Sequence, residues 1–357
     1  MVNDAYTVIG LMSGTSLDGL DIAICTFIKN KDTWSFSINQ AITVEYSNEW
    51  KNRLAEAHKL SSIDLLHLHK LYGKYLGEKV LEFKKSFNAT IDFIASHGQT
   101  IFHDPSSGLT FQLGDGVEIS ALTGIPVVSD FRSLDVALGG QGAPLVPVGD
   151  DLLFGNYAAC LNLGGFANIS FHKSGKRIAY DICPVNILIN YFVNKYFNLE
   201  MDEDGKNAQK GTINKMLLAV LNNLEYYTIS NPKSLGREWL ENEMLPVINS
   251  FDDRPENILY TIYEHISIQL SDAFKEFKGK EVLITGGGAK NRFLLELLND
   301  KTDKKIVIPD EMLIDYKEAL IFAFLGVLRW RNEINTLASV TGAKRDSSGG
   351  SICFPSK

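Results

Sequence analysis

Hydrophobic and polar residues are spaced along this chain in patterns that predict buried strands first and amphipathic helices after them. Residues 6–12 and 21–27 are apolar segments rich in strand-forming side chains, and residues 34–46 alternate as a third strand would. Residues 48–58 and 61–87 then carry apolar side chains at helical spacing. We therefore predict a β-hairpin, a third strand and two helices.

The next part of the chain contains three short apolar segments, each followed by polar residues. We predict strands at residues 92–96, 110–113 and 126–129, with a helix that ends near residue 123 before the last of them. Ligands bind at the carboxyl ends of strands in open α/β sheets. The polar residues at these ends are His97 to Thr100, Gly114 to Gly116 and Asp130 to Arg132.

The same order of elements returns after a segment rich in Gly and Pro, residues 139–147. Residues 158–171 again indicate a strand, a Gly-rich turn and a strand, and residues 177–182 indicate a third strand. The elements that follow are helices from about 186 and 211, a helix at 257–277, a strand at 281–285, a turn at 286–289, a helix at 291–298, a strand at 305–308 and a helix at 316–332.

A repeat of roughly 150 residues is too long for a solenoid and is typical of a duplicated domain. We predict an α/β fold of two duplicated domains, each a mixed β-sheet flanked by helices, with their Gly-rich hairpin turns facing each other across a cleft. The expected domains are residues 1–138 and 139–335. Residues 336–357 are expected to form a tail that returns to the surface.

Composition and charge narrow the class of protein. The 357 residues, 45% hydrophobic and 22% charged, suit a globular protein of two domains. A net charge of −8 argues against a nucleic-acid or anionic-membrane partner. No apolar run approaches the roughly 20 residues of a membrane span. We expect no leader sequence, because the residues before the first strand contain no basic region followed by an apolar core. The four cysteines lack CxxC spacing, so we expect neither zinc nor disulfides and a cytoplasmic location.

The turn between the first two strands is the first candidate binding site. It contains Ser13, Gly14, Thr15, Ser16, Asp18 and Gly19. Small hydroxyl residues and glycines leave backbone N–H groups free for phosphate oxygens. The same residues are usual in an ordinary hairpin turn, and composition by itself leaves both interpretations open. The similar turn at Gly164 and Gly165 favours phosphate binding.

Several other catalytic motifs are missing: the chain has no GxxxxGK[ST], GxGxxG, GxSxG or HExxH pattern. Phosphoryl transfer suits what remains, because it needs positioned phosphates, magnesium and a carboxylate that accepts the proton of the nucleophile. The candidate carboxylates are Asp18, Asp115, Asp130, Asp135, Asp181 and Glu318. Asp181 closes a predicted strand, where it could face the cleft or cap the next helix. Glycines 286–288 allow a flat ring or a phosphate to approach the backbone closely.

Six motifs together resemble one known family. They are MSGTSLDGLD (12–21), SHGQT (96–100), LGDG (113–116), DFRSLDVALGGQGAPLVP (130–147), LNLGGFANIS (161–170) and ITGGGAKN (284–291). In this order, from about residue 6 to 335, they resemble the anhydro-N-acetylmuramic acid kinases of the sugar kinase, Hsp70 and actin superfamily. The resemblance implies an actin-like (ribonuclease H-like) fold with ATP bound between the two domains.

The resemblance also implies an activity. ATP and water would act on 1,6-anhydro-N-acetylmuramic acid, opening the anhydro bridge and phosphorylating O6, in the recycling of cell-wall sugars by a cytoplasmic homodimer. By the same resemblance, residues 13–19 would hold the β- and γ-phosphates of ATP, with Asp18 near Mg²⁺. Gly164 and Gly165 would form the second phosphate loop, and Gly286, Gly287 and Gly288 would contact the adenosine.

For the chemistry, the resemblance implies Asp181 as the base that deprotonates the attacking water. The residues implied on the sugar side are His97, Asp130, Arg132 and Glu318. One departure lies beside the base: the family commonly has DTGPGN where this chain has DICPVN, residues 181–186. The loss of two glycines changes the backbone angles that this loop can adopt, so its shape and its contacts with phosphate or sugar are in question.

Two alternatives follow from the same residues. One is a kinase for another small sugar, and the other is a non-catalytic ATP-switch protein of the same superfamily. The second would need a large substrate-binding extension or a polymerisation surface, and we expect none because the chain ends soon after the last predicted helix. The motif at residues 130–147 belongs to the sugar-handling members and favours the kinase.

Overall fold

The computed structural model describes residues 4–14, 17–229 and 233–355, and the chain divides into two compact units. Unit 1 contains residues 1–154 and 316–357, and unit 2 contains residues 155–315. This division differs from the expected limits at residues 138 and 335 because two helices pack within unit 1. Helix α5 (Val146–Phe154) packs on strand β3, and helix α12 (Glu311–Trp330) packs on the first sheet so closely that a Cβ at Gly10 would overlap the main-chain oxygen of Ala319.

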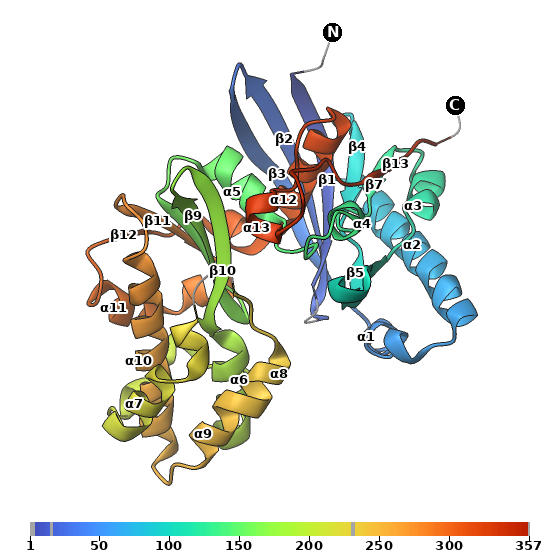
Figure 1. Cartoon of the computed structure of the whole chain (residues 1–357). Helices are drawn as coiled ribbons and strands as arrows, with labels where there is room; N and C mark the ends of the chain where they lie inside the picture. Colours follow the sequence, from blue (N-terminus) through green and yellow to red (C-terminus); the bar gives the residue numbers. More distant parts are fainter. Residues whose placement is uncertain (1–3, 15–16, 230–232, 356–357) are drawn as a thin grey trace. The chain divides into compact units, whose positions relative to one another are not determined.

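Unit 1 is built on a six-stranded mixed sheet in the order β13-β7-β4-β1-β2-β3 (Figure 1). Strands β1, β2 and β3 are antiparallel, β4 and β7 extend the sheet parallel to β1, and β13 closes it antiparallel to β7. A separate ribbon pairs β5 with β6. The bounds are β1 Ala5–Ser13, β2 Gly19–Asn30, β3 Thr33–Glu45, β4 Phe93–Ser96, β5 Gln99–Asp104, β6 Leu109–Leu113, β7 Val127–Ser129 and β13 Ser351–Cys353.

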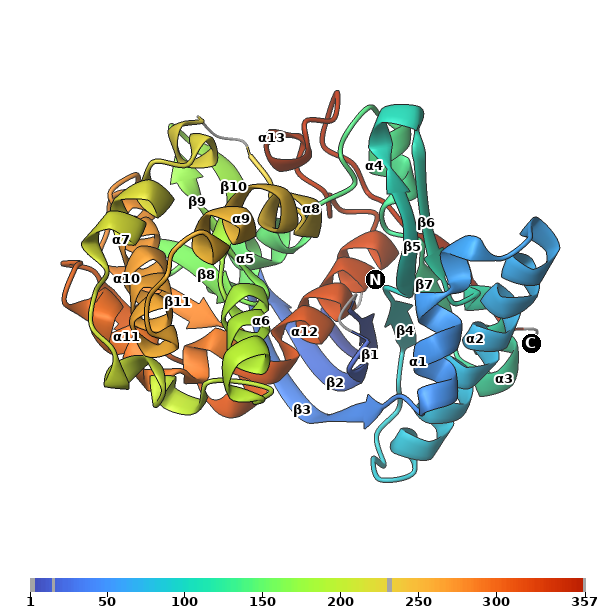
Figure 2. The same cartoon turned by 90° about the horizontal axis from the view of Figure 1, so that it is seen from below.

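The helices of unit 1 begin at polar caps that the chain provides. Ser47 caps α1, Ser61 caps α2 and Asp115 caps α3, each with a side-chain oxygen that accepts a main-chain N–H of the first turn. Helices α2 and α3 lie side by side in Figure 2. The bounds are α1 Asn48–Ala55, α2 Ser62–Lys84, α3 Gly116–Thr123, α4 Ser133–Ala137 and α13 Ala338–Thr341, with short turns η1 Ala57–Lys59 and η2 Pro105–Ser107.

Unit 2 repeats the architecture with a five-stranded sheet in the order β10-β9-β8-β11-β12. Strands β8, β9 and β10 are antiparallel, and β11 and β12 continue parallel to β8. The strands are β8 Ala159–Leu163, β9 Phe166–Lys173, β10 Lys176–Pro184, β11 Glu281–Thr285 and β12 Lys305–Val307. The helices are α6 Asn186–Phe197, α7 Lys215–Asn222, α8 Arg237–Trp239, α9 Leu245–Asn249, α10 Pro255–Phe274 and α11 Arg292–Asn299. Shorter helical turns are η3 Glu203–Gly205, η4 Ala208–Lys210, η5 Glu225–Thr228, η6 Leu240–Met244 and η7 Gly287–Lys290.

The two sheets share one topology. If the strands of each unit are numbered in chain order, without the β5–β6 ribbon and β13, both sheets have the order 3-2-1-4-5. In both, strand 2 is antiparallel to strands 1 and 3, and strands 4 and 5 run parallel to strand 1. This confirms the predicted duplicated α/β fold of mixed sheets flanked by helices, which is the arrangement of actin-like domains. Sequence patterns did not predict β5, helix α5 or β13, which are short or lie in segments rich in Gly and Pro.

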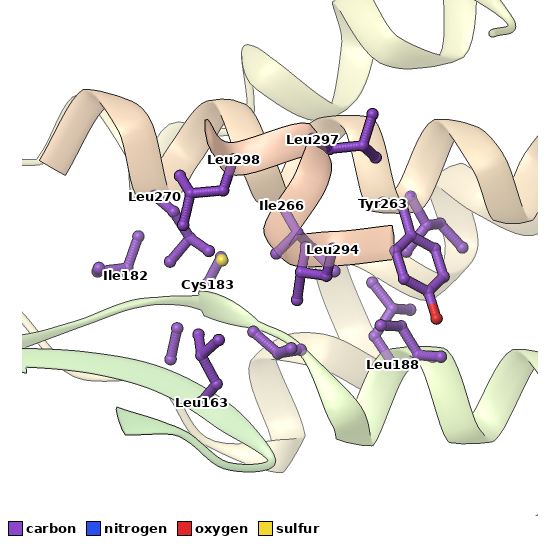
Figure 3. Packing of buried hydrophobic residues seen from close by; sticks show 14 of the residues in the cluster. Leu163, Ile182, Cys183, Leu188, Tyr263, Ile266, Leu270, Leu294, Leu297 and Leu298 are labelled. Carbon is purple, nitrogen blue, oxygen red and sulfur yellow. The ribbon is translucent and has the colours of Figure 1, made fainter. Parts of the chain in front are cut away.

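Each unit has its own hydrophobic core. In unit 2, side chains of α10 and α11 pack over the sheet and α6, as Figure 3 shows for Ile266, Leu294 and Leu298 near Cys183 and Leu188. In unit 1, apolar residues of β1 and β2 pack against α2 and α3. Among the described residues, no helix is both long and apolar enough to cross a membrane.

Candidate functional site

The first expected phosphate turn joins β1 to β2 in unit 1. Leu17 has a left-handed backbone, with φ of 59°, and its N–H donates to the main-chain oxygen of Gly14 at 3.3 Å. The Asp18 side chain is exposed. Gly19 cannot be replaced without strain, because a Cβ there would lie 2.8 Å from the main-chain oxygen of Val44 on β3. Two residues predicted to contact phosphate lie outside the described part of the chain, namely Thr15 and Ser16.

The side chain of Ser13 belongs to a buried network. Ser13 is only 2% exposed, and its hydroxyl donates to the amide oxygen of Gln99 and is hydrogen-bonded to Tyr46 at 2.7 Å. Tyr72 donates to the same hydroxyl at 3.0 Å and is itself bonded to Tyr46 at 2.6 Å. The hydroxyl therefore anchors the end of β1. A phosphate bound by Ser13 would have to contact its main chain instead of its hydroxyl.

The second expected phosphate turn, Gly164 and Gly165, joins β8 to β9 in unit 2. The main-chain oxygen of Gly165 accepts N–H groups of Val185 at 2.8 Å and Ile187 at 3.3 Å, and that of Gly164 accepts the N–H of Asn186 at 3.3 Å. These donors belong to the start of α6, whose first N–H groups have no partner inside the helix. The turn is thus held against the N-terminus of α6 through its carbonyls.

The glycines expected to contact adenosine lie next to this turn. Gly286 follows β11 with φ of 83° and ψ of 164°, a conformation that only glycine adopts readily. A Cβ at Gly288 would lie 2.8 Å from Cβ of Leu163, the last residue of β8. The Asn186 side chain donates to the main-chain oxygen of Leu163 at 3.1 Å, and a Cβ at Gly287 would lie 3.6 Å from that amide. Unit 2 therefore brings both predicted Gly-rich turns together around Asn186.

Asp181, the expected base, lies on β10 in unit 2 and is only partly exposed. Its Oδ2 accepts the main-chain N–H of Leu235 at 2.9 Å. Burial raises the pKa of the Asp181 carboxyl, and this hydrogen bond opposes the increase. No hydrogen bond from the described residues reaches Oδ1. A carboxylate with a raised pKa and one free oxygen is suited to accept a proton near neutral pH.

Asp181 does not cap the helix that follows. Helix α6 has Val185 at its N-cap position without a side-chain cap, so of the two roles open for Asp181 the capping role is excluded. The pairing of β10 with β9 is irregular between Asp181 and Cys183. An irregularity of this kind changes the direction in which a side chain points.

The departure from the family pattern beside Asp181 is accommodated by packing. Cys183 and Val185 are completely buried, Ile182 is 4% exposed, and all three belong to the unit 2 core. Figure 3 shows Ile182 and Cys183 in this core. None of the three has a positive φ. The backbone therefore does not require a glycine at Cys183, whereas Val185 has φ of −124° and ψ of −96°, outside the helical and extended regions.

One contributor was missed by the sequence patterns. The segment Lys233–Leu235 contacts Asp181 at its carboxylate and at its main chain, because the N–H of Asp181 also donates to the main-chain oxygen of Lys233 at 3.1 Å. This segment lies 52 positions or more from Asp181 in the sequence and has no regular secondary structure. The only local signal is the Lys-Ser-Leu-Gly sequence before α8, which suits a turn.

His97 and Arg132, two expected sugar-side residues, form a pair in unit 1. Nδ1 of His97 donates to the main-chain oxygen of Gly98 at 2.8 Å, and Nε2 accepts from Arg132 Nε at 3.1 Å and Nη2 at 2.7 Å. Burial, and then the charge of Arg132, lowers the pKa of His97 to about 3, so the imidazole is neutral. Arg132 Nη1 donates to the main-chain oxygen of Gly142 at 2.6 Å. Burial lowers the Arg132 pKa to about 10, and it remains a cation.

Asp130 and His97 line a pocket of about 290 Å³ within unit 1. The pocket lies at the carboxyl ends of β4 and β7, where Ser96 and Ser129 end the two strands. Asp130 is exposed and has a left-handed backbone, with φ of 58°, and Ser133 donates to its carboxylate at 2.5 Å. Such conformations in residues other than glycine concentrate at functional sites. The buried Ser96 hydroxyl in this lining has no hydrogen-bond partner among the described residues.

Glu318, the remaining sugar-side candidate, is exposed on α12 of unit 1. Neighbouring groups shield the Glu318 carboxyl from part of the surrounding water, and this loss of hydration raises its pKa. The charge of Arg132 acts in the opposite direction, and the charge of Asp21 adds to the increase. The preceding residue, Lys317, forms a buried ion pair with Asp150 of α5 at 2.7 Å. This pair joins the two helices on which the chain leaves and re-enters unit 1.

Two of the candidate carboxylates have structural partners. Asp115 caps α3 and accepts from Lys70 at 2.6 Å. Asp135 is 1% exposed and accepts from the Gly142 N–H and the Thr341 hydroxyl, both at 2.8 Å. These bonds explain both positions without a ligand.

Comparison with known proteins gives one family. The family model for anhydro-N-acetylmuramic acid kinase matches residues 6–355. A protein of that name from Sulfurimonas denitrificans is 35% identical over 96% of this chain and 98% of its own length, and one from Haemophilus influenzae is 35% identical over 97% of each. Another from Bacillus cereus is 32% identical over 97% of this chain and 98% of its own length.

Solved structures resemble this chain less closely. A component of (R)-2-hydroxyglutaryl-CoA dehydratase from Acidaminococcus fermentans has a TM-score of 0.43 at 14% identity, covering 89% of this chain and 96% of that one. A ROK family glucokinase from Streptomyces griseus has a TM-score of 0.41 at 11% identity, covering 89% and 98%. Likeness at this level supports no conclusion, and the fold assignment rests on the sheet topology above.

Proposed function

Because the chain belongs to the anhydro-N-acetylmuramic acid kinase family, we propose that it phosphorylates 1,6-anhydro-N-acetylmuramic acid with ATP. The family is one of phosphotransferases that use ATP in the recycling of cell-wall sugars. The observation that carries the proposal is the family match, which extends over residues 6–355. The products are N-acetylmuramic acid 6-phosphate and ADP.

The proposed chemistry is hydrolytic opening coupled to phosphoryl transfer. Oδ1 of Asp181 accepts a proton from water as the water oxygen forms a bond to the anomeric carbon. The bond from that carbon to O6 breaks, O6 bonds to the γ-phosphorus, and the bond from γ-phosphorus to the leaving oxygen of ADP breaks. The raised pKa of Asp181 and its free Oδ1 support this role.

The residues proposed for ATP are the Gly-rich turns. The first is the turn of residues 13–19, and the others are Gly164–Gly165 and Gly286–Gly288, which are adjacent in unit 2. Backbone N–H groups in such turns bind phosphate oxygens, and glycines allow close approach.

For Mg²⁺ the protein would supply one carboxylate, and the remaining ligands would come from the phosphates of ATP and from water. The proposed ligand is the exposed carboxylate of Asp18. Among the described residues there is no group of three or more His, Cys, Asp or Glu side chains that could enclose an ion. Magnesium at phosphoryl-transfer sites is usually held by one or two carboxylates together with substrate phosphates. When bound, it would neutralise charge on the transferring phosphate.

The sugar-side proposal keeps His97, Asp130, Arg132 and Glu318. The neutral His97 imidazole and the Arg132 cation are held in one fixed pair, and His97 and Asp130 line the unit 1 pocket. Fixed donors reduce the cost of ordering a binding site. By family analogy we also propose that the protein is cytoplasmic, that it binds the small sugar as its partner, and that it is a homodimer. Sedimentation velocity of the purified protein would test the homodimer.

A coupled assay of ADP release tests the function. We expect turnover with 1,6-anhydro-N-acetylmuramic acid and little with N-acetylmuramic acid or glucose. Asp181→Asn should still bind ATP but lose about 10² to 10⁴ in kcat, the usual contribution of a general base. Asp253→Asn is the matched control, because Asp253 accepts hydrogen bonds only from amide groups on the unit 2 surface. ADP release that does not depend on the anhydro sugar would refute the function, and near-normal turnover of Asp181→Asn would assign the base to another carboxylate.

A further inference from the structure

Three hydrogen bonds join Asp181 to Tyr226 and to the segment Lys233–Leu235 in unit 2. The main-chain N–H of Leu235 donates to Oδ2, and the N–H of Asp181 donates to the main-chain oxygen of Lys233. The hydroxyl of Tyr226 donates to the main-chain oxygen of Asp181. The residue is therefore bound at its side chain and at both of its main-chain groups, although these partners lie far from it in the sequence.

The partners of Asp181 also hold one another. The Lys233 ammonium donates to the main-chain oxygen of Tyr226 at 3.0 Å and lies 4.4 Å from the centre of the Tyr226 ring. The Tyr226 ring in turn packs against Trp239 at 5.3 Å and Tyr227 at 5.6 Å. A cation over an aromatic ring adds to the hydrogen bond. The residues that bind Asp181 are therefore held in place by contacts with one another as well as by their bonds to Asp181.

We propose that Tyr226 and the segment Lys233–Leu235 act as a positioning clamp for the Asp181 carboxylate. The Leu235 N–H occupies Oδ2, so that Oδ1 alone accepts the proton of the attacking water. The Tyr226 hydroxyl and the Lys233 carbonyl hold the main chain of Asp181, which fixes the direction of the carboxylate. This inference rests on the function proposed above, and the positioning residues act through Asp181 without contacting the sugar.

The clamp also sets where the base titrates. A main-chain N–H donated to a carboxylate stabilises the ionised form, and its loss raises the carboxyl pKa. The ionisable groups near Asp181 are Tyr226 of η5, Cys183 of β10 and Lys233. Burial lowers the pKa of Lys233, and the carboxylate of Glu276, which follows α10, opposes this decrease. Burial raises the pKa values of the Cys183 thiol and the Tyr226 hydroxyl, so neither titrates on the acidic side. A change in the acidic limb of the kcat profile that is confined to variants of these partners therefore reports on Asp181.

The test compares two substitutions at one position in the full-length enzyme. Leu235→Pro removes the N–H, and we expect the acidic limb of the kcat–pH profile to move up by about one pH unit. At pH 6 this lowers kcat by up to about tenfold, with the KM for ATP unchanged, because less of the base is ionised. Leu235→Ala retains the N–H, and its acidic limb stays at the wild-type pH whatever its kcat.

A second pair of variants keeps the test decisive if Leu235→Pro does not fold. Tyr226→Phe loses the hydroxyl that donates to the main-chain oxygen of Asp181. Without this bond the main chain of Asp181 is held less firmly, which weakens the bond from the Leu235 N–H to Oδ2, so the acidic limb should move in the same direction by a smaller amount. Tyr227→Phe is the matched control, since the Tyr227 hydroxyl is bonded to His265 at 3.0 Å instead. Far-UV circular dichroism and ATP binding check that each variant is folded.

The outcomes separate the inference from the function. If Asp181→Asn abolishes turnover while the folded Leu235 and Tyr226 variants keep the wild-type acidic limb, the clamp is refuted and the proposed function stands. If Asp181→Asn keeps turnover, the role of Asp181 as base is refuted and the clamp with it. Movement of the limb in Tyr226→Phe but not in Tyr227→Phe supports the clamp.

Discussion

Replacement of Gly286 by alanine should destabilise unit 2 through two separate effects. The first is conformational: with φ of 83° and ψ of 164°, the residue lies in a region that costs other residues about 1–3 kcal/mol. The second is steric: the new Cβ would lie 2.9 Å from the main-chain carbon and oxygen of Leu163 and closer still to the Asn162 side chain. Overpacking against a rigid strand costs about 1–3 kcal/mol.

These terms are offset in part by the unfolded chain. Alanine restricts the unfolded state more than glycine does, which returns about 0.4–1 kcal/mol. The net loss in the free energy of unfolding for Gly286→Ala is then about 1–6 kcal/mol, a large part of the 5–15 kcal/mol that is usual for a domain. Because Leu163 leads into the Gly164–Gly165 turn, we also expect weaker binding of ATP.

Two other glycines separate the effects. Gly175 has φ of 77° but no atom within 4 Å of a built Cβ, so Gly175→Ala isolates the conformational term and should cost about 1–2 kcal/mol. Gly287 has neither a positive φ nor a contact closer than 3.6 Å, so Gly287→Ala should change stability by no more than about 0.5 kcal/mol.

The assay must report on unit 2 alone, since the two units need not unfold together. Hydrogen exchange of the β11 amides, measured alongside urea unfolding followed by circular dichroism, gives the local free energy of opening. The expected order of destabilisation is Gly286→Ala, then Gly175→Ala, then Gly287→Ala. If Gly286→Ala is as stable as Gly287→Ala, the steric and conformational reasoning is wrong.

Two further predictions concern buried charge. Burial lowers the pKa of His265 to about 3, so protons bind the unfolded chain preferentially below its ordinary pKa. The contribution of His265 to the free energy of unfolding is therefore fully present above about pH 6.5. Below that pH the free energy of unfolding falls by up to about 1.4 kcal/mol per pH unit. His265→Gln should lack this contribution, and equal pH slopes in urea unfolding would contradict it. Asp150→Asn removes the carboxylate that pairs with the buried Lys317 ammonium at 2.7 Å and should cost about 3–5 kcal/mol. The double variant Asp150→Leu/Lys317→Met should recover most of that loss, and the absence of recovery would argue against the ion-pair explanation.

The order of strands and helices could be predicted from local patterns. Apolar runs and caps are set by residues a few positions apart, and the predicted strands at 158–171 and 281–285 correspond to β8, β9 and β11. The repeat of one element order in both halves, together with six motifs, was sufficient to predict the duplicated fold and the family. Among the segments that were missed, α5 and β13 are stabilised mainly by contacts with distant parts of unit 1.

Side-chain roles depended on partners far apart in the sequence. The Ser13 hydroxyl, expected beside a phosphate, is bonded to Tyr46, Tyr72 and Gln99, because the strand that places Ser13 at the end of β1 also turns its side chain inward. Asp115 has the same residue type and a similar strand-end position to Asp130, yet it caps a helix. Local patterns cannot distinguish such cases, since burial is decided by what packs against each strand.

The chain by itself therefore determined most of the strands and longer helices, that they are duplicated, and to which family they belong, because periodicity, turn residues and motifs are properties of neighbouring residues. Only the tertiary structure decided that Asp181 has one oxygen bound by Leu235 and the other without a hydrogen bond from any described residue, and that the two Gly-rich turns of unit 2 meet at Asn186. These contacts join residues separated by many positions, and their geometry follows from strand register and core packing, which no single segment of the sequence contains.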